Sequence, residues 1–259
     1  PHNQARPNGH PAPTPEKALR SLLRTLLLPG LPTFEAPLNA NQRRFKALHL
    51  ANRQAFLGQQ ALLYCLLDDH DMARRHCQAC LDELNKCCSR LQALMEGSAE
   101  QQRVDTLARL SQGYALMLGA SEDDELRHAT LAVGELLMLR SLEVAKRLAA
   151  GCDSPTAKWL TQCGRIYAYS QRTLCVLALS ESLSLRLDRA SLLLTCNEHC
   201  HQALVELDRL AACHTEANQL LRELEQLHQC SSREPDAPWL HQISTSLLFS
   251  LKRLEDFHA

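Results

Sequence analysis

Hydrophobic residues recur at alternating steps of three and four along most of the chain, which is the spacing of an amphipathic α-helix. Polar residues fill the positions between them, as expected for helices that bury one face. Glycine and proline fall almost wholly between these periodic segments, where helices begin and end. The breaks predict eight helices, over residues 15–28, 39–67, 71–95, 98–118, 121–150, 155 to the mid-180s, 188–229 and 239–257.

Several helix starts carry a capping signal. Pro15 and Pro155 each follow a hydroxyl residue that can serve as N-cap, and proline is favoured at the first helical position. Ser98 with Gln101 predicts a capping box, in which each side chain bonds to the other residue's backbone N–H. Asp188 is the predicted cap of the long helix over 188–229.

The composition favours helices over sheets. The chain is rich in leucine and alanine, poor in valine and isoleucine, and only 4% aromatic. Strands are enriched in β-branched and aromatic residues, whereas leucine, alanine, glutamate and arginine cost little in a helix. We therefore predict an all-α fold, an elongated antiparallel bundle of about seven to eight helices joined by short connections.

The chain is expected to have three parts. Residues 1–14 are proline-rich and lack large apolar side chains, which predicts a disordered linker. Residues 15–38 predict a short basic amphipathic helix and a loop. Residues 39–259 form the predicted helical bundle domain.

The stretch RRHCQACLDELNKCC, residues 74–88, raises the question of what the twelve cysteines of the chain do. They could bind metal, form disulfides or fill the interior of a bundle. Free cysteine behaves as a small, usually buried hydrophobe, and one apolar stripe passes through several of these cysteines: Cys77, Cys80, Leu84, Cys87, Leu91 and Leu94.

We favour the interior, and therefore a reducing, cytoplasmic location, because disulfide frameworks mostly serve short chains with little core. The alternative that we do not favour is a metal site built from Cys77, Cys80, Cys196 and Cys200. Structural zinc sites usually place their cysteine pairs at turns, whereas these pairs lie inside predicted helices. No metal or other cofactor is expected.

The predicted helix over 188–229 carries a heptad seam. A sustained period of 3.5 residues requires a facing helix, either within the bundle or on a partner. Its leucines Leu207, Leu210, Leu221 and Leu224 are therefore the candidate partner-binding residues. The seam comprises Leu193, Cys196, Cys200, Ala203, Leu207, Leu210, His214, Ala217, Leu221, Leu224 and His228.

Positive charge is concentrated near the beginning of the chain. The net charge of the whole chain is −1, which argues against nucleic-acid binding, but residues 1–60 hold eight Lys and Arg against two Glu. A basic amphipathic helix can lie on an anionic membrane or dock in a partner's groove. The candidate basic surface consists of Lys17, Arg20, Arg24, Arg43, Arg44, Lys46 and Arg53.

The residues suggest no enzymatic chemistry. Two ExxH pairs occur, Glu125/His128 and Glu225/His228, which di-iron bundles also use. The inward acids that such a site needs on two other helices cannot be identified, so we read the pairs as solvent-facing. We expect a non-enzymatic scaffold or adaptor that binds another helical protein through exposed helix faces. A membrane-associated tethering module is the alternative, and a metal-binding bundle comes third.

Overall fold

The computed structural model describes residues 38–67, 71–120, 124–152, 154–180, 187–211 and 236–257. The chain divides into two units, residues 1–38 and 39–259, and all of the described residues except Leu38 belong to the second. The predicted linker, the predicted helix over 15–28 and the second half of the heptad seam lie outside the described residues.

The prediction of an all-α fold is confirmed. The described ranges contain helices and no strands. None of these helices offers an apolar stretch that could span a bilayer. The helices are α2 (Ala40–Leu66), α3 (Asp71–Met95), α4 (Gln101–Ala120), α5 (Asp124–Ala150), α6 (Pro155–Leu177), α8 (Arg189–Ala211) and α10 (Ala237–Phe257).

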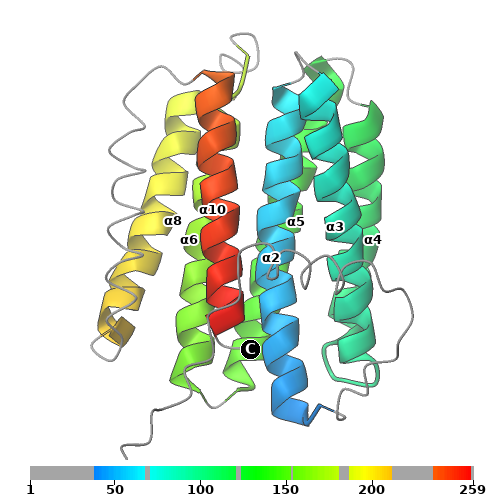
Figure 1. Cartoon of the computed structure of the whole chain (residues 1–259), viewed down its shortest axis with the longest axis vertical. Helices are drawn as coiled ribbons and strands as arrows, with labels where there is room; N and C mark the ends of the chain where they lie inside the picture. The colour runs from blue at the N-terminus through cyan, green and yellow to red at the C-terminus, as the bar shows by residue number, and fades with distance from the viewer. Residues whose placement is uncertain are drawn as a thin grey trace, which may run out of the picture. The chain divides into compact units, whose positions relative to one another are not determined.

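Consecutive helices from α2 to α8 alternate in direction, as short connections require (Figure 1). Helix α10 runs parallel to α8 and antiparallel to α2 and α6 (Figure 1). Helix α2 is the central element, because it packs against α3, α5, α6 and α10.

Two helices are enclosed on all sides over part of their length. Every residue from 54 to 64 in α2 is buried, and so is every residue from 166 to 176 in α6. A helix so enclosed has no solvent face, so its polar side chains must find partners inside the protein. The other helices keep the expected exposed face, and the predicted stripe of α3 is buried at Cys80, Leu84, Cys87 and Leu91.

The buried polar side chains of α2 bond to the neighbouring helices. Asn52 Nδ2 donates to the carbonyl of Leu160 on α6 (3.1 Å), and Gln59 Nε2 donates to the carbonyl of Gly134 on α5 (2.7 Å). Arg172 of α6 donates to Gln59 Oε1 (3.4 Å) and forms an ion pair with Glu135 of α5 (3.1 Å). The Arg172 side chain is 5% exposed and that of Glu135 is 43% exposed, so a carboxylate at the surface of the bundle neutralises the buried guanidinium.

Glycines allow these helices to approach closely. The buried Tyr114 of α4 donates its hydroxyl to the carbonyl of Gly58 (2.8 Å) and lies against Gly134, where a Cβ would be 2.9 Å from the hydroxyl oxygen. A Cβ at Gly164 would overlap the side chain of Asn52. The absence of a side chain at Gly164 therefore makes room for the Asn52–Leu160 hydrogen bond.

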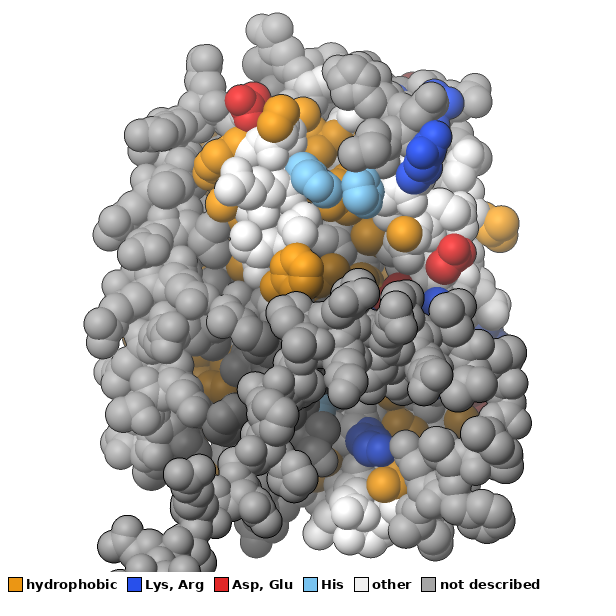
Figure 2. Space-filling model, in the orientation of Figure 1, with side chains coloured by type: hydrophobic (Ala, Val, Ile, Leu, Met, Phe, Trp, Pro, Cys, Tyr) orange, Lys and Arg blue, Asp and Glu red, His pale blue; other side chains and the backbone are white. Residues whose placement is uncertain are grey.

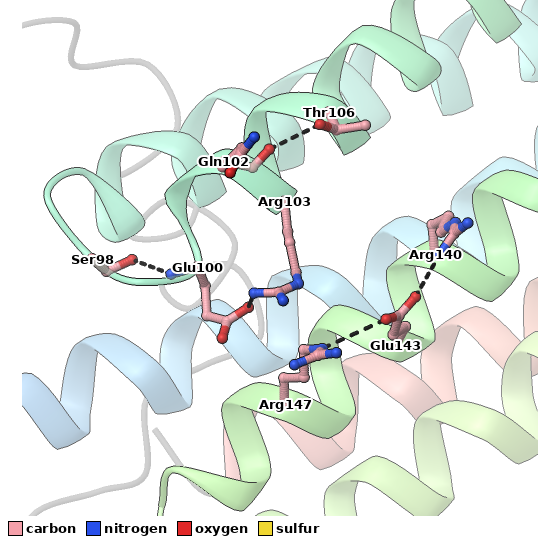
Figure 3. Close-up of polar contacts among 8 residues, drawn as sticks. All are labelled: Ser98, Glu100, Gln102, Arg103, Thr106, Arg140, Glu143 and Arg147. Atoms are coloured by element: carbon pink, nitrogen blue, oxygen red, sulfur yellow. Dashed lines mark hydrogen bonds and ion pairs between the residues drawn. The ribbon is translucent and has the colours of Figure 1, made fainter.

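The start of α4 departs from the predicted capping box. Ser98 Oγ accepts from the backbone N–H of Glu100 (3.3 Å), and Gln101 Oε1 accepts from that of Gly97 (2.8 Å), so both bonds are shifted by one residue. Figure 3 shows Ser98 at this turn and the Glu100–Arg103 ion pair at the start of α4. The same view shows the ion pairs that Glu143 forms with Arg140 and Arg147 on α5. Gly97 has a φ of 71°, a left-handed conformation that glycine adopts at little cost.

A complete capping box occurs instead at α2, where Asn39 and Gln42 exchange side-chain-to-backbone hydrogen bonds. The predicted cap at Asp188 is confirmed, because its carboxylate accepts from the N–H of Ser191 (3.3 Å). Ser154 precedes α6 as predicted, but its side chain makes no capping hydrogen bond.

The predicted end of α6 in the mid-180s was wrong. The helix ends at Leu177, although no glycine or proline follows. Leu179 turns back into the core, and Arg189 Nη2 donates to the free carbonyl of Leu177 (3.3 Å). A cation at the C-terminus of a helix stabilises its unpaired carbonyls, so Arg189 stabilises this helix end from twelve residues further along the chain.

The contact between Gly164 and Asn52 can be tested by substitution. We expect Gly164→Ala to lower the free energy of unfolding by about 1–3 kcal/mol, because the added methyl must displace Asn52 in a packed interior. Gly113→Ala is the matched control, since a Cβ there meets nothing within 4 Å. That change should be neutral or raise stability by up to about 1 kcal/mol through helix propensity. Urea unfolding followed by circular dichroism measures both, and equal effects would contradict the close approach.

Candidate functional site

A cavity of about 410 Å³ opens between α2, α3 and α10. Leu57 and Leu248 form its apolar part, and Gln60 and Thr245 provide uncharged polar groups. Arg53 and Glu83 lie on its wall and pair with each other at 2.8 Å. We call this site the α3/α10 cavity; it is lined by Arg53, Leu57, Gln60, Tyr64, His76, Ala79, Cys80, Glu83, His241, Thr245 and Leu248.

Three aromatic rings from three helices meet in this cavity. Tyr64 of α2 stacks on His76 of α3 with ring centroids 5.1 Å apart, and His241 of α10 lies 4.8 Å from His76. The Tyr64 hydroxyl and His241 Nδ1 share a hydrogen bond of 2.9 Å. Figure 2 shows two adjacent histidine side chains on this face of the molecule, with hydrophobic side chains around them.

Burial sets the ionisation of the ring cluster. It lowers the pKa of His241 below its ordinary value of 6.5, and the nearby His76 lowers it further. Burial is also the main cause that raises the pKa of the Tyr64 hydroxyl, and the nearby Cys80 raises it further. At neutral pH the cavity therefore presents a neutral imidazole and a neutral phenol, which suit hydrogen bonding and stacking.

The cysteine side chains lie mainly in the interior. All ten described cysteines are free thiols, and eight of them are buried. Burial raises the pKa to about 12 for Cys80, Cys175 and Cys200, which keeps these thiols protonated. They also form hydrogen bonds that sequence reasoning missed: Cys80 donates to Gln60 Oε1 (3.4 Å) and Cys175 to the carbonyl of Gln59 (3.0 Å).

The four cysteines of the alternative metal site lie in different parts of the bundle. Cys80 belongs to the main core, whereas Cys196 and Cys200 belong to a smaller apolar cluster with Tyr169 of α6 and Met138 of α5. Cys77 is only partly buried. Among the described residues, no three His, Cys, Asp or Glu side chains are grouped so that they could hold one metal ion. Glu125 and His128 are both exposed on α5.

The first half of the predicted seam faces the bundle. Leu207 is fully buried in the main core, and Leu210 is partly buried against it. Leu221 and Leu224 lie outside the described residues. The part of the seam in α8 is therefore satisfied by its own chain, which was one of the two possibilities that the heptad pattern left open.

The predicted basic surface is divided. Arg43, Arg44 and Lys46 are exposed near the start of α2, where Arg44 Nη1 donates to the carbonyl of Gly151 (2.7 Å). Arg53 lies further along α2, half-buried beside Glu83 in the α3/α10 cavity. Lys17, Arg20 and Arg24 lie outside the described residues.

Comparison with known proteins gives no relative from which a function could be carried over. No family model matches the chain, and no curated protein or solved structure is significantly similar to it. The function must therefore be argued from the geometry of the chain itself.

Sequence reasoning missed Tyr64, His76 and His241 as site residues. These residues lie on three helices, and His241 is 165 positions after His76. No local pattern joins them. Only the packing of α10 beside α2 brings the rings together.

The protonated state of the thiols predicts slow alkylation. At pH 8 a pKa of about 12 leaves roughly one molecule in 10⁴ as thiolate, which is the reactive form. We expect iodoacetamide to label the partly exposed Cys77 at least about 100-fold faster than Cys80 or Cys175 in the folded protein. Peptide-resolved mass spectrometry measures the rates, and labelling in urea, where all cysteines should react, is the control. Equal rates for Cys77 and Cys175 would contradict a space-filling role.

Proposed function

We propose that this chain is a non-enzymatic helical module that binds a helical protein partner on the face formed by α3 and α10. The observation that carries the proposal is the α3/α10 cavity, which lies beside an exposed aromatic side chain. Phe249 of α10 is 62% exposed and lies one helical turn after Thr245, which lines the cavity.

The size and lining of the cavity suit an anchoring side chain. Its 410 Å³ falls in the range of sites that accept a ligand group. Stable interfaces are typically centred on an aromatic or aliphatic anchor held in such a pocket and surrounded by polar groups. Here Leu57 and Leu248 supply the apolar contact, and the Arg53–Glu83 pair supplies the polar edge.

The partner that fits this face is an amphipathic helix. Helices α3 and α10 run in the same direction on either side of α2 (Figure 1). A helix laid along such a surface presents anchors at every third or fourth residue. One anchor would enter the cavity, and a neighbouring one would cover Phe249.

The groups in the cavity favour binding over catalysis. Glu83 is paired with Arg53 and also lies 3.5 Å from Lys86, which keeps its carboxylate occupied. The raised pKa of Cys80, about 12, works against its use as a nucleophile. A general base needs a pKa near the working pH and a nucleophile within reach, and the neutral Tyr64 and protonated Cys80 do not supply an activated one.

The proposal differs from the expectation drawn from the heptad pattern in the surface it uses. Leu207 is enclosed in the core and is not available to a partner. The partner-binding role of Leu221 and Leu224 stays a prediction, as does membrane contact through the basic surface. The α3/α10 face takes their place as the leading candidate, because its cavity and exposed aromatic are both described.

The proposed surface can be tested with two variants and a control. Ala79→Arg places a long side chain at the cavity, where Ala79 is exposed, and Phe249→Ser removes the exposed aromatic. We expect either change to reduce the capture of specific partners from cell extract by about tenfold or more, as loss of an anchor does. Quantitative mass spectrometry of the captured proteins provides the readout.

Leu116→Ser is the matched control, because Leu116 is 77% exposed on α4 and does not line the cavity. It should retain the same partners as the unchanged protein. Circular dichroism confirms that each variant is folded. If all three variants capture the same proteins equally, the α3/α10 face is not the binding surface.

A further inference from the structure

Helix α10 buries one face against the bundle, where Trp239, Ile243 and Leu248 are partly buried beside a line of fully buried residues. Leu240, Ser244 and Leu247 are its buried residues among those whose side chains are described, and they follow each other at helical spacing. Its main neighbours are α6 and α2. By contrast α2 is buried on all sides over residues 54–64. Elements with little buried apolar surface open at a lower free-energy cost than the core does.

Polar contacts also join α10 to α2 and α3. Gln60 Nε2 donates to Ser244 Oγ (2.9 Å) in the middle of the buried line. One turn earlier, His241 shares its hydrogen bond with Tyr64 and packs against His76 of α3. Both histidines thus lie between α10 and the helices beneath it, at the point where these helices would separate.

We propose that α10 is a pH-sensitive strap, which loosens from α2 and α3 when His241 becomes protonated beside His76. Loosening α10 opens the α3/α10 cavity, since His241, Thr245 and Leu248 form its α10 wall. The inference goes beyond the proposed function and concerns how α10 is held, whether or not a partner binds there.

The charged groups around the ring pair do not favour two cationic imidazoles. From α2 the titratable or charged groups lining the cavity are Tyr64 and Arg53, and from α3 they are Cys80 and Glu83 together with His76. No charged or titratable side chain of α6 lines it among the described residues. Glu83 is the one anion on the described wall, and it already pairs with Arg53 and Lys86.

Two imidazolium rings with centroids 4.8 Å apart would repel each other across a partly dry space. The Tyr64 hydroxyl can donate or accept, so its hydrogen bond to His241 does not by itself set the pH response. The pH response comes instead from the burial of His241 and from the nearby His76, since both lower the pKa of His241 when α10 is docked.

The lowered pKa of His241 determines how the docking of α10 changes with pH. The docked pKa of His241 lies below its ordinary value of 6.5, so released α10 binds a proton more readily than docked α10 does. Docking is therefore strongest above about pH 6.5 and weakens as the pH falls below it. If His241 stays neutral in the docked state, its protonation in released α10 weakens docking at pH 5.5 by at most about 11-fold.

Hydrogen exchange of the whole chain, followed by mass spectrometry at pH 7.5 and 5.5, tests the proposal. With rates corrected for intrinsic exchange, the opening of α10 should increase by about three- to tenfold at the lower pH, while the peptides of α2 and α6 keep their protection. His241→Gln should abolish this difference, and His128→Gln, at an exposed position on α5, should preserve it.

If His241→Gln loosens α10 at both pH values, the pH response of the His76→Gln variant becomes the deciding measurement. This change removes one charge and leaves the Tyr64–His241 bond in place. A smaller pH response in His76→Gln supports the proposal. An α10 protection that is the same at both pH values overturns it. So does an unchanged pH response in the His241→Gln or His76→Gln variant, or a loss of protection that is equal in all helices.

Discussion

The enclosure of α2 is the constraint on which the rest of this structure depends. Over residues 54–64 the helix has no solvent face, yet it carries Gln54, Gln59 and Gln60. A buried amide without a partner costs about 1–3 kcal/mol, so the surrounding helices must present hydrogen-bonding groups at defined heights. The carbonyl of Gly134 and the guanidinium of Arg172 do so for Gln59, and these bonds fix α5 and α6 against α2.

The same constraint gives the cysteines a second role. A thiol is small enough to lie against an enclosed helix, and it can also donate or accept a weak hydrogen bond. Cys175 bonds to the backbone of α2, whereas Cys88 and Cys80 bond to the side chains of Gln54 and Gln60. Gln60 in turn bonds to Ser244 of α10. The core network of α2 therefore extends to the edge of the α3/α10 cavity, which links the packing of the interior to the proposed site.

Much of the fold could be predicted from the sequence, because periodicity and breaks are local signals. The bounds of α3 agree with the predicted residues 71–95, and its cysteine stripe faces the core. The end of α6 could not be predicted, because no glycine or proline marks it and the side chain that binds its last carbonyl, Arg189, belongs to α8. The candidate site could not be predicted either, since Tyr64, His76 and His241 meet only through helix packing. The leucine seam was a real pattern, but Leu207 shows that its first half serves the bundle.

The most direct test of the account compares two buried glutamines of α2 by urea unfolding. Gln59→Met should lower the free energy of unfolding by about 1–3 kcal/mol, because it removes an acceptor of the buried Arg172 guanidinium and the side-chain donor to the Gly134 carbonyl. Gln54→Met removes only a bond to the Cys88 sulfur and an acceptor oxygen with no partner in the described structure. Its effect should stay within about 0.5 kcal/mol of zero or be stabilising. A neutral Gln59→Met, or an equal loss in both variants, would contradict the claim that hydrogen bonds to α2 specify how the bundle packs.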